Sequence, residues 1–532
     1  MSGRPGGGEG RCGLRNTLFP APMACKAGAN THDEGMTLID RRAMIAATGA
    51  ALILPAHLSA QTRPEPFSWD RLVARAQRLS RTPFVDVPPH PRAAHVDYDA
   101  INQARFREAR TIWGDLPGDT GIRLFPLSAN APQPVTIALV VGGRATPLRY
   151  DPAMFETPGG NAVAALGPDA GFAGFRIMNA ARDADWLAFL GASYFRAAGA
   201  QKQFGLSARG IAINTSLPGK EEFPRFTHFW LERTGRSSVT VHALLDGASI
   251  TGAFRFVNSL APDGVRQDVT AALFPRRAIE ELGLMPMTSM FWYDQGNRAQ
   301  GVSDWRPEVH DSDMLAIRST DGTAHTRPLV NPTAPRASIF VEPSIPGFGL
   351  LQRDRDFDHY QDDGVFYDRR PSLWATPTAP SGGGQVRLYE FPTDSEYTDN
   401  VAAYWTPAVQ PRGGARIDAR YRLDWSSATA SPGPMVAMVD AVRRAAADAQ
   451  GIERLVVDFS GVSAGEKPDI WTDVAGGTLV KRAGYPILGK PGFYRVVLDL
   501  RRSRGGGTTD IRLQLRNGQA PFSEYVHYPL GA

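Results

Sequence analysis

The 532-residue sequence predicts a mainly β protein built from antiparallel sandwiches. Three observations favour this class. Apolar and polar side chains alternate along much of the chain, glycine and proline turns separate the alternating segments, and helical patterns are scarce. Alternation places successive side chains on opposite faces of a strand, so that one face can be buried in a core. Many short strands of this kind are typical of β-sandwiches.

Three segments show helical signals. In Trp69–Leu79 the apolar side chains fall on one helix face, and Ser68 precedes them as an N-cap. Residues 101–112 follow Asp99, and an alanine-rich segment spans Met435–Ala449. The sequence therefore predicts a helix in each of these three places.

Five other segments alternate with the two-residue period of a strand. They are Val239–Leu245, Ile417–Trp425, Leu455–Phe459, Phe493–Asp499 and Ile511–Leu515. Proline and glycine interrupt the pattern at Pro407–Gly414, which indicates a domain boundary. We therefore expect a large β-sandwich domain over residues 61–406, a linker over 407–416, and a second domain over 417–532. The second domain has the size and strand spacing of an immunoglobulin-like sandwich.

The first 60 residues have the pattern of an export signal. Arg41 and Arg42 precede the apolar run Ala46–Leu54, and small residues end at Ala60. A charged region, a short apolar region and a small-residue cleavage site describe a secretory signal, and paired arginines point to the twin-arginine route. We expect translation to start at Met36 and the mature protein to lie in the periplasm.

Composition excludes several classes of function. Both cysteines, Cys12 and Cys25, lie in the leader, so the mature chain can form neither disulfides nor thiol-based sites. A net charge of +4 without a polybasic run gives no support to nucleic-acid binding. A calcium-loop pattern that begins at Asp354 has His359 at its glycine position, so we predict neither a metal nor a cofactor.

Three motifs combine acidic and aromatic residues in a way that suits sugar binding. They are Gly347–Trp374, which mixes Asp, Arg and aromatic side chains, His310–Asp313 (HDSD) and Pro392–Asn400 (PTDSEYTDN). Aromatic rings can stack on sugar rings, and carboxylate and guanidinium groups bind hydroxyls. The three motifs therefore predict one carbohydrate site.

Splitting a glycosidic bond needs a carboxylic acid and a second carboxylate across the bond. Spacing alone does not choose among the candidates Asp311, Asp313, Asp356, Asp362, Asp363, Asp394, Glu396 and Asp399. The Asp311-Ser312-Asp313 triplet could also hold a metal and a nucleotide sugar, as in a glycosyltransferase. The export signal weighs against that alternative, because nucleotide sugars are cytosolic.

The chain resembles the family of periplasmic glucan biosynthesis proteins G and D, and most of all the D branch. The resemblance spans most of residues 64–425, and its motifs are highly specific. They include DAGFAGFRI (Asp169–Ile177), FLGASYFRA (Phe189–Ala197), FGLSARGIAI (Phe204–Ile213), HDSD, GFGLLQRDRDFDHYQD (Gly347–Asp362) and TDNVAAYW (Thr398–Trp405).

The resemblance implies a large sandwich of the sugar-mutarotase type followed by an immunoglobulin-like domain. It implies a role in making osmoregulated periplasmic glucans with a β-1,2-linked backbone, and an inverting endo-β-1,2-glucanase activity. The general acid then falls on Asp399 and the general base on Asp311. Burial or a neighbouring anion should keep Asp399 protonated, whereas an arginine from the 347–374 segment should keep Asp311 ionised.

Other residues are predicted to contact the substrate. They are Tyr367, Glu396, Asp313, His310, Arg369, Arg370, Trp374, Tyr194 and Arg196. The same cleft would also suit a non-catalytic protein that accepts nascent β-1,2-glucan from a membrane glucosyltransferase and presents it for modification. A functional link to such a glucosyltransferase is expected for both roles, and a dimer is compatible with either one.

Overall fold

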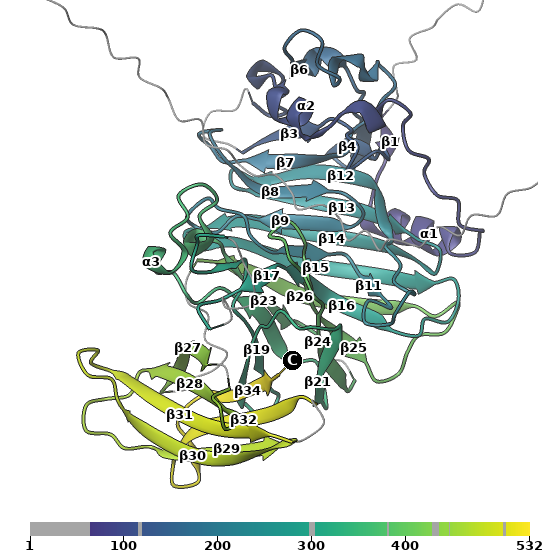
Figure 1. The fold of residues 1–532 in the computed structure, drawn as a ribbon. Coiled ribbons are helices and arrows are strands. Elements are labelled where there is room, and N and C mark those ends of the chain that lie inside the picture. Colours follow the sequence, from purple (N-terminus) through teal and green to yellow (C-terminus); the bar gives the residue numbers. More distant parts are fainter. Residues whose placement is uncertain are drawn as a thin grey trace, which may run out of the picture.

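The computed structural model describes residues 64–114, 120–296, 304–379, 382–427, 436–445, 447–503 and 507–531. The expected leader, residues 1–60, lies outside this part of the chain. Strands dominate what is described, which confirms the predicted mainly β class (Figure 1). Within the described residues, no helix is both long enough and apolar enough to cross a membrane.

One long sheet runs through most of the molecule, and its strands come from distant parts of the chain. In spatial order it contains β1 (Glu65–Pro66), β5 (Arg144–Pro147), β4 (Thr136–Val141), β12 (Arg225–Gly235), β13 (Ser238–Asp246), β14 (Ile250–Ala261), β15 (Gly264–Pro275), β26 (Ile417–Ser426), β23 (Ser372–Pro377), β22 (Gly347–Leu351), β19 (Met314–Arg318), β20 (Ala324–Pro328), β34 (Tyr525–Leu530), β32 (Thr509–Asn517) and β29 (Asp469–Ala475), with β33 (Ala520–Pro521) beside β32.

A second sheet packs against the first and completes a sandwich. It contains β21 (Arg336–Glu342), β24 (Gly384–Glu390), β25 (Val401–Pro407), β16 (Leu282–Ser289), β10 (Ser207–Arg209), β9 (Tyr194–Ala197), β8 (Asp185–Leu190), β7 (Gly174–Met178) and β3 (Gly121–Phe125), with β11 (Ala212–Ile213) beside β16. Aromatic rings fill the space between the sheets: Phe189 of β8 lies 5.7 Å from Phe229 of β12 and 5.3 Å from Phe256 of β14, measured between ring centres. Such edge-to-face pairs stabilise a core beyond simple burial of area.

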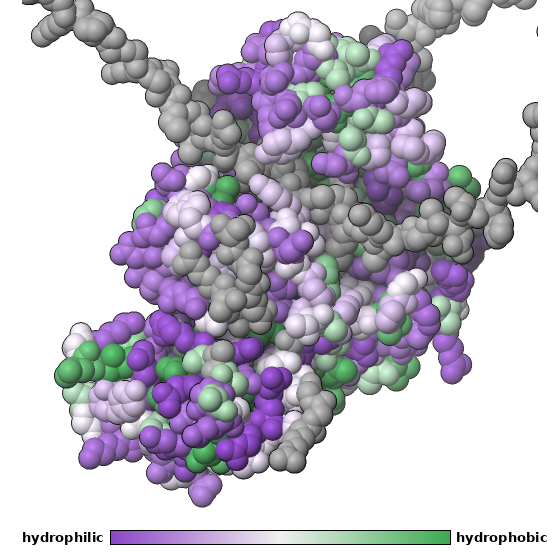
Figure 2. All heavy atoms as spheres, viewed as in Figure 1, coloured by the Kyte–Doolittle hydropathy of each residue, from purple (hydrophilic) through white to green (hydrophobic). Residues whose placement is uncertain are grey.

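The C-terminal domain, residues 436–531, has a separate sheet and a separate core. Its four-stranded sheet contains β27 (Met438–Ala445), β28 (Ile452–Ser460), β31 (Phe493–Arg502) and β30 (Gly477–Pro486). This sheet faces β29, β32 and β34 across an apolar core, which confirms a smaller second sandwich. Green, hydrophobic residues reach the surface of this domain in Figure 2. Val480, Tyr485 and Leu488 are among its exposed large side chains.

Two short ladders and a few helices complete the described structure. The ladders are β17 (Phe291–Tyr293) with β18 (Val309–His310), and β2 (Arg105–Phe106) with β6 (Phe155–Glu156). The helices are α1 (Trp69–Leu79), α2 (Tyr98–Gln103) and α3 (Phe357–Tyr360), with 3-10 turns at Ala93–His95, Glu108–Arg110, Pro152–Met154, Ala164–Leu166 and Tyr367–Arg369. The helix predicted at Trp69–Leu79 is confirmed, with Ser68 accepting the Arg71 N–H as its N-cap.

The other two helix predictions are wrong in informative ways. The helix predicted over residues 101–112 is the shorter α2, because Arg105 and Phe106 are drawn into the ladder with β6. The helix predicted over Met435–Ala449 is strand β27, which pairs with β28 along its length. Alanine favours helices only weakly, and pairing with a neighbouring strand overrides that preference.

The predicted start of the second domain also differs from the structure. Strand β26 was expected to open the C-terminal domain, but it pairs with β15 on one side and β23 on the other, in the middle of the large sheet. Alternation identified the strand correctly but could not identify its partners, because pairing depends on residues far away in sequence. The Pro407–Gly414 segment therefore connects two strands of the large domain.

Candidate active site

Asp399 lies in the turn between β24 and β25, and its neighbour Asn400 holds that turn in place. The buried Asn400 side chain accepts the Phe291 N–H at 2.8 Å and donates to the carbonyls of Phe291 and Phe391, both at 3.0 Å. Asp399 itself lines a cavity of about 400 Å³, together with Tyr194 and Arg196. The sequence prediction that these three residues share a site is therefore consistent with their placement.

Burial raises the pKa of Asp399, while the guanidinium groups of Arg196, Arg209 and Arg370 oppose the rise. The net direction is upward, as a general acid requires. Burial was one of the two causes expected from the sequence; the charges that act on Asp399 are cationic rather than anionic. Burial likewise raises the pKa of Tyr194 to about 12, and the Arg209 guanidinium lies 4.9 Å above the Tyr194 ring.

Asp311 follows β18 and is buried. Its backbone N–H donates to the Met290 carbonyl at 2.8 Å, and its carboxylate forms an ion pair with Arg370. Of the arginines in the 347–374 segment, Arg370 is thus the one that pairs with Asp311. An adjacent cation favours the ionised carboxylate, which is the state that a general base needs.

Arg370 connects the two acids. Its guanidinium lies 3.9 Å above the ring of Tyr367, pairs with Asp311 and interacts electrostatically with Asp399. Burial, followed by the charge of Arg196, lowers the pKa of Arg370 to about 9. The arginine still carries its charge at neutral pH, so Asp311 and Asp399 share one cation.

Tyr367 and Glu396 form a hydrogen-bonded pair beside these acids. The Tyr367 hydroxyl donates to Glu396 Oε2 at 2.6 Å, and Arg306 Nη1 donates to the same oxygen at 3.0 Å. The structure thus brings together Tyr367 and Glu396, two of the predicted substrate contacts, and adds Arg306 to them.

His310 and Asp313 have other partners. The His310 ring bonds to Glu308 at 2.7 Å and to Gln352 at 3.0 Å. Burial opposes protonation of His310, but Glu308 raises its pKa to about 9. Asp313 accepts the N–H groups of Arg353 and Asp354 at 2.6 and 2.9 Å, and burial raises its pKa to about 6.

Two predicted sugar contacts have a different environment. Trp374 is half-buried and packs against the apolar core of the C-terminal domain; its contact with substrate stays a prediction. Arg369 is exposed, with its guanidinium 4.4 Å above the Phe366 ring and 3.4 Å from Asp368.

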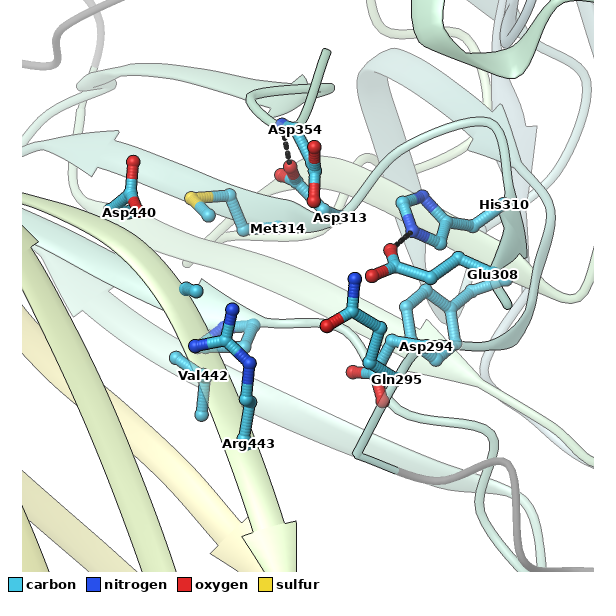
Figure 3. Close-up of a pocket in the computed structure, with 13 residues that line it drawn as sticks. Asp294, Gln295, Glu308, His310, Asp313, Met314, Asp354, Asp440, Val442 and Arg443 are labelled. Carbon is cyan, nitrogen blue, oxygen red and sulfur yellow. Dashed lines mark hydrogen bonds and ion pairs between the residues drawn. The ribbon is translucent and has the colours of Figure 1, made fainter. Parts of the chain in front are cut away.

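A second, smaller pocket lies between the large domain and β27, and Figure 3 shows its acidic lining. Beside it, ligand atoms of Glu308, Asp354 and His359 lie within 4.8 Å of one another, a spacing that a metal ion could bridge. The structure pairs His359 with Asp354 at 2.6 Å and Glu308 with His310 at 2.7 Å.

Sequence reasoning missed several residues that organise the site. Asn400, Arg209 and Gln352 stand inside motifs used for the family resemblance, but no chemical pattern singled them out. The fully buried Gln352 amide donates to the carbonyls of His310 and Tyr367, both at 3.1 Å. Arg306 lies outside the three acidic-aromatic motifs, and no chemical pattern in the sequence singled it out.

The fold and the site together define a β-sandwich protein with a cavity of about 400 Å³ beside Asp399. Residues 67–530 match the family described as "Periplasmic glucan biosynthesis protein, MdoG". This chain belongs to that family, which confirms the resemblance inferred from its motifs.

Named relatives support the D branch. The chain is 38% identical to Glucans biosynthesis protein D 2 of Ralstonia nicotianae, over 92% of this chain and 96% of the relative. It is 41% identical to Glucans biosynthesis protein D 1 of the same organism, over 90% and 94%. Identity to Glucans biosynthesis protein D of Xanthomonas oryzae pv. oryzae is 39%, over 88% and 92%.

Solved structures add little. A galactose mutarotase related enzyme from Lactobacillus acidophilus aligns with a TM-score of 0.22 and 8% identity, over 46% of this chain and 98% of that one. A polysaccharide lyase, BACCELL_00875, aligns with a TM-score of 0.19 and 9% identity, over 67% and 43%. At these TM-scores neither likeness supports an inference, and the architecture rests on the strand pairing.

Proposed function

We propose that this protein is an inverting endo-β-1,2-glucanase of periplasmic glucan biosynthesis, exported by the twin-arginine route. One observation supports this role above the others. Two buried carboxyl groups, Asp311 and Asp399, interact with the same guanidinium but differ in what surrounds them. Asp399 beside the cavity has a raised pKa, while Asp311 pairs with the guanidinium. Two carboxyl groups held in different protonation states are the requirement for acid and base roles in glycoside hydrolysis.

In the proposed reaction, Asp399 donates its proton to the glycosidic oxygen as the bond from that oxygen to the anomeric carbon breaks. Water attacks the opposite face of the same carbon, and Asp311 takes the water's proton, either directly or through a substrate hydroxyl and further waters. Inversion follows, because a single displacement occurs without a covalent intermediate. Asp399 ends ionised and Asp311 protonated, so the protons balance and solvent resets both groups.

Tyr367 contributes to substrate binding in this proposal. Its single hydroxyl proton is given to Glu396. A tyrosine hydroxyl has one donor and two acceptor positions, so the free lone pairs of Tyr367 can accept a hydrogen bond from a sugar hydroxyl or from water. Tyr194 and Arg196 line the cavity on the Asp399 side and complete the proposed binding surface.

One observation favours a second function, that of a non-catalytic glucan-binding protein. The Asp311 carboxylate is already occupied by Arg370, and a close cation reduces the basicity of a carboxylate. In this role the cavity would accept nascent β-1,2-glucan that a membrane glucosyltransferase supplies, and would present it for modification.

Product analysis of residues 61–532 on linear β-1,2-glucan separates the two functions. We expect short β-1,2-oligosaccharides from the wild type and a loss of about 10²–10⁴-fold in rate for Asp399→Asn and for Asp311→Asn. Both variants should retain glucan binding. The exposed Asp363→Asn is the matched control and should keep its rate. Intact polymer in every sample, with binding retained, would reject the hydrolase and leave the glucan-binding protein.

A further inference from the structure

The Arg306 guanidinium is the centre of a carboxylate cluster next to the proposed catalytic residues. Its side chain is 10% exposed and contacts three acids, Asp304, Asp362 and Glu396. Burying an arginine among several carboxylates costs desolvation free energy, unless well-aligned hydrogen bonds and ion pairs compensate for it. Two of these acids, Asp304 and Asp362, fix the position of the guanidinium. The third, Glu396, belongs to the candidate active site.

Asp304 and Asp362 hold the guanidinium from two sides. Asp304 accepts from Nε at 3.0 Å and from Nη2 at 2.6 Å, which is a bidentate pair, and Asp362 Oδ2 accepts from Nη1 at 2.6 Å. The other oxygen of Asp362 accepts the backbone N–H groups of Gly364 and Val365 at 2.9 and 2.8 Å. Arg306 is therefore fixed both to its own segment and to the backbone just before Tyr367.

The third contact reaches Glu396. Nη1 of Arg306 lies 3.0 Å from Glu396 Oε2, the same oxygen that accepts the Tyr367 hydroxyl at 2.6 Å. A carboxylate that receives a charge-assisted bond is held in one orientation. Because Glu396 accepts the only proton of the Tyr367 hydroxyl, that hydroxyl can act only as an acceptor toward other groups.

We propose that Arg306 is a positioning residue that acts through Glu396 to present the Tyr367 hydroxyl as a hydrogen-bond acceptor to substrate or water. This inference rests on the proposed function, since it assigns a role within the same site. The structural alternative is that Arg306 only stabilises the fold of residues 361–367. The two differ in whether the effect of Arg306 depends on Glu396.

A double-mutant cycle tests this dependence. The variants are Arg306→Gln, Glu396→Gln and the combination of both, with Arg306→Lys as the conservative substitution. We expect Arg306→Gln to lower kcat about 10–100-fold and to weaken glucan binding several-fold, because a misplaced Tyr367 hydroxyl loses a bond that is made in the bound state and strengthened in the transition state. The double variant should be no slower than Glu396→Gln within about threefold, because residues that act as a unit are not additive. Arg306→Lys should recover part of the rate.

A matched control separates positioning from folding. Arg276 is a similarly buried arginine, 8% exposed, that pairs with Asp246 at the far end of β13. Arg276→Gln should lower Tm as Arg306→Gln does, with kcat unchanged. Fully additive losses in the cycle, or an Arg306→Gln variant that is destabilised but retains its kcat, would overturn the inference.

A double-mutant cycle measured on glucan affinity tests the inference independently of the proposed hydrolase activity. The same variants are made in the Asp399→Asn background, and the Kd for β-1,2-glucan is measured by calorimetry. Non-additive losses of affinity would support the inference even if the wild type released no product, a result that rejects only the hydrolase. Additive losses of affinity with an inactive wild type would reject both.

Discussion

Two arginines in the segment Gly347–Trp374 perform different tasks, although its sequence looks uniform. Arg353, in the first half, forms a closed pair with Glu524 of the C-terminal domain, with N–O distances of 2.7 and 2.5 Å. Arg370, in the second half, is shared by Asp311, Tyr367 and Asp399. Arg353 joins two domains, whereas Arg370 belongs to the candidate site.

This difference shows how two buried arginines of similar appearance can be distinguished. Arg353 and Glu524 satisfy one another, and further bonds join each of them to the backbone of Val439 at 3.0 Å. The two Nη atoms of Arg353 are thus taken up within the interface, by Glu524 and the Val439 carbonyl. Arg370 instead pairs with Asp311, lies over the Tyr367 ring and interacts electrostatically with Asp399, which lines the cavity; its pKa falls to about 9. Shared, incompletely neutralised charge is typical of functional sites.

The largest effect is expected from breaking the Arg353–Glu524 ion pair at the interface between the domains. Arg353→Met leaves the fully buried carboxylate of Glu524 without a cation, and should lower the free energy of unfolding by about 3–5 kcal/mol. Urea unfolding measures this change. The double variant Arg353→Met/Glu524→Leu should recover most of the loss, because replacing both charges removes the unpaired one. Activity per folded molecule should stay unchanged; a loss of activity with normal stability would contradict the comparison.

The next effect concerns Arg370 in the candidate site. Arg370→Met removes the cation that Asp311 and Tyr367 share, and should slow glucan hydrolysis about 10²–10³-fold. Initial rates with linear β-1,2-glucan provide the measurement. Arg369→Met is the control, because its exposed pair with Asp368 should contribute little. Equal losses of rate in both variants would contradict the distinction between Arg370, as a residue of the site, and Arg369, as an exposed surface residue.

A smaller effect tests the position of Trp374. Its ring lies over β22, where an added Cβ at Gly349 would approach Trp374 Cε3 to 2.8 Å and the Leu373 carbonyl oxygen to 2.3 Å. Trp374→Ala should therefore cost about 2–3 kcal/mol of unfolding free energy through lost packing, less than a fully buried tryptophan. Glucan affinity, measured by calorimetry, should not change. A tenfold weaker affinity of the Trp374→Ala variant for glucan would instead support the prediction that Trp374 contacts the sugar.

The smallest effect is a pH dependence at the seam between the domains. Strand β20 pairs with β34 beside a contact of 3.0 Å between the His325 and His527 rings. Burial, with His325 next, lowers the pKa of His527 to about 3. Below pH 6.5 the unfolded chain therefore binds a proton that the native chain excludes, and stability falls as pH decreases from 6.5 toward 3.

His527→Phe should remove this part of the pH dependence. At pH 5 the histidine should cost about 1–2 kcal/mol relative to pH 7, and phenylalanine keeps the ring contacts with Phe340 and Tyr525. Unfolding free energies of both proteins between pH 4 and 7 measure the difference. Parallel curves for the two proteins would show that the seam does not titrate in this range.

Local patterns predicted much of the fold. Alternation identified β13, β26, β28, β31 and β32, because a half-buried strand leaves a two-residue period in its own sequence. Capping chemistry placed α1 correctly at Ser68. The same reasoning failed for β27, since an alanine-rich segment has no clear period and its conformation depends on pairing with β28.

The sequence by itself determined the β class and the family, because these depend on residue types in local order, while Asp311 and Asp399 stay the acids that the family resemblance implies. Only the tertiary structure decided which arginine pairs with which acid. Arg370 and Asp311 are 59 positions apart, and Arg306 and Glu396 are 90 apart. Ion pairs between distant segments leave no periodic trace, since a guanidinium can meet any carboxylate that the sheets bring near it. The division of Gly347–Trp374 between interface and site follows from that freedom.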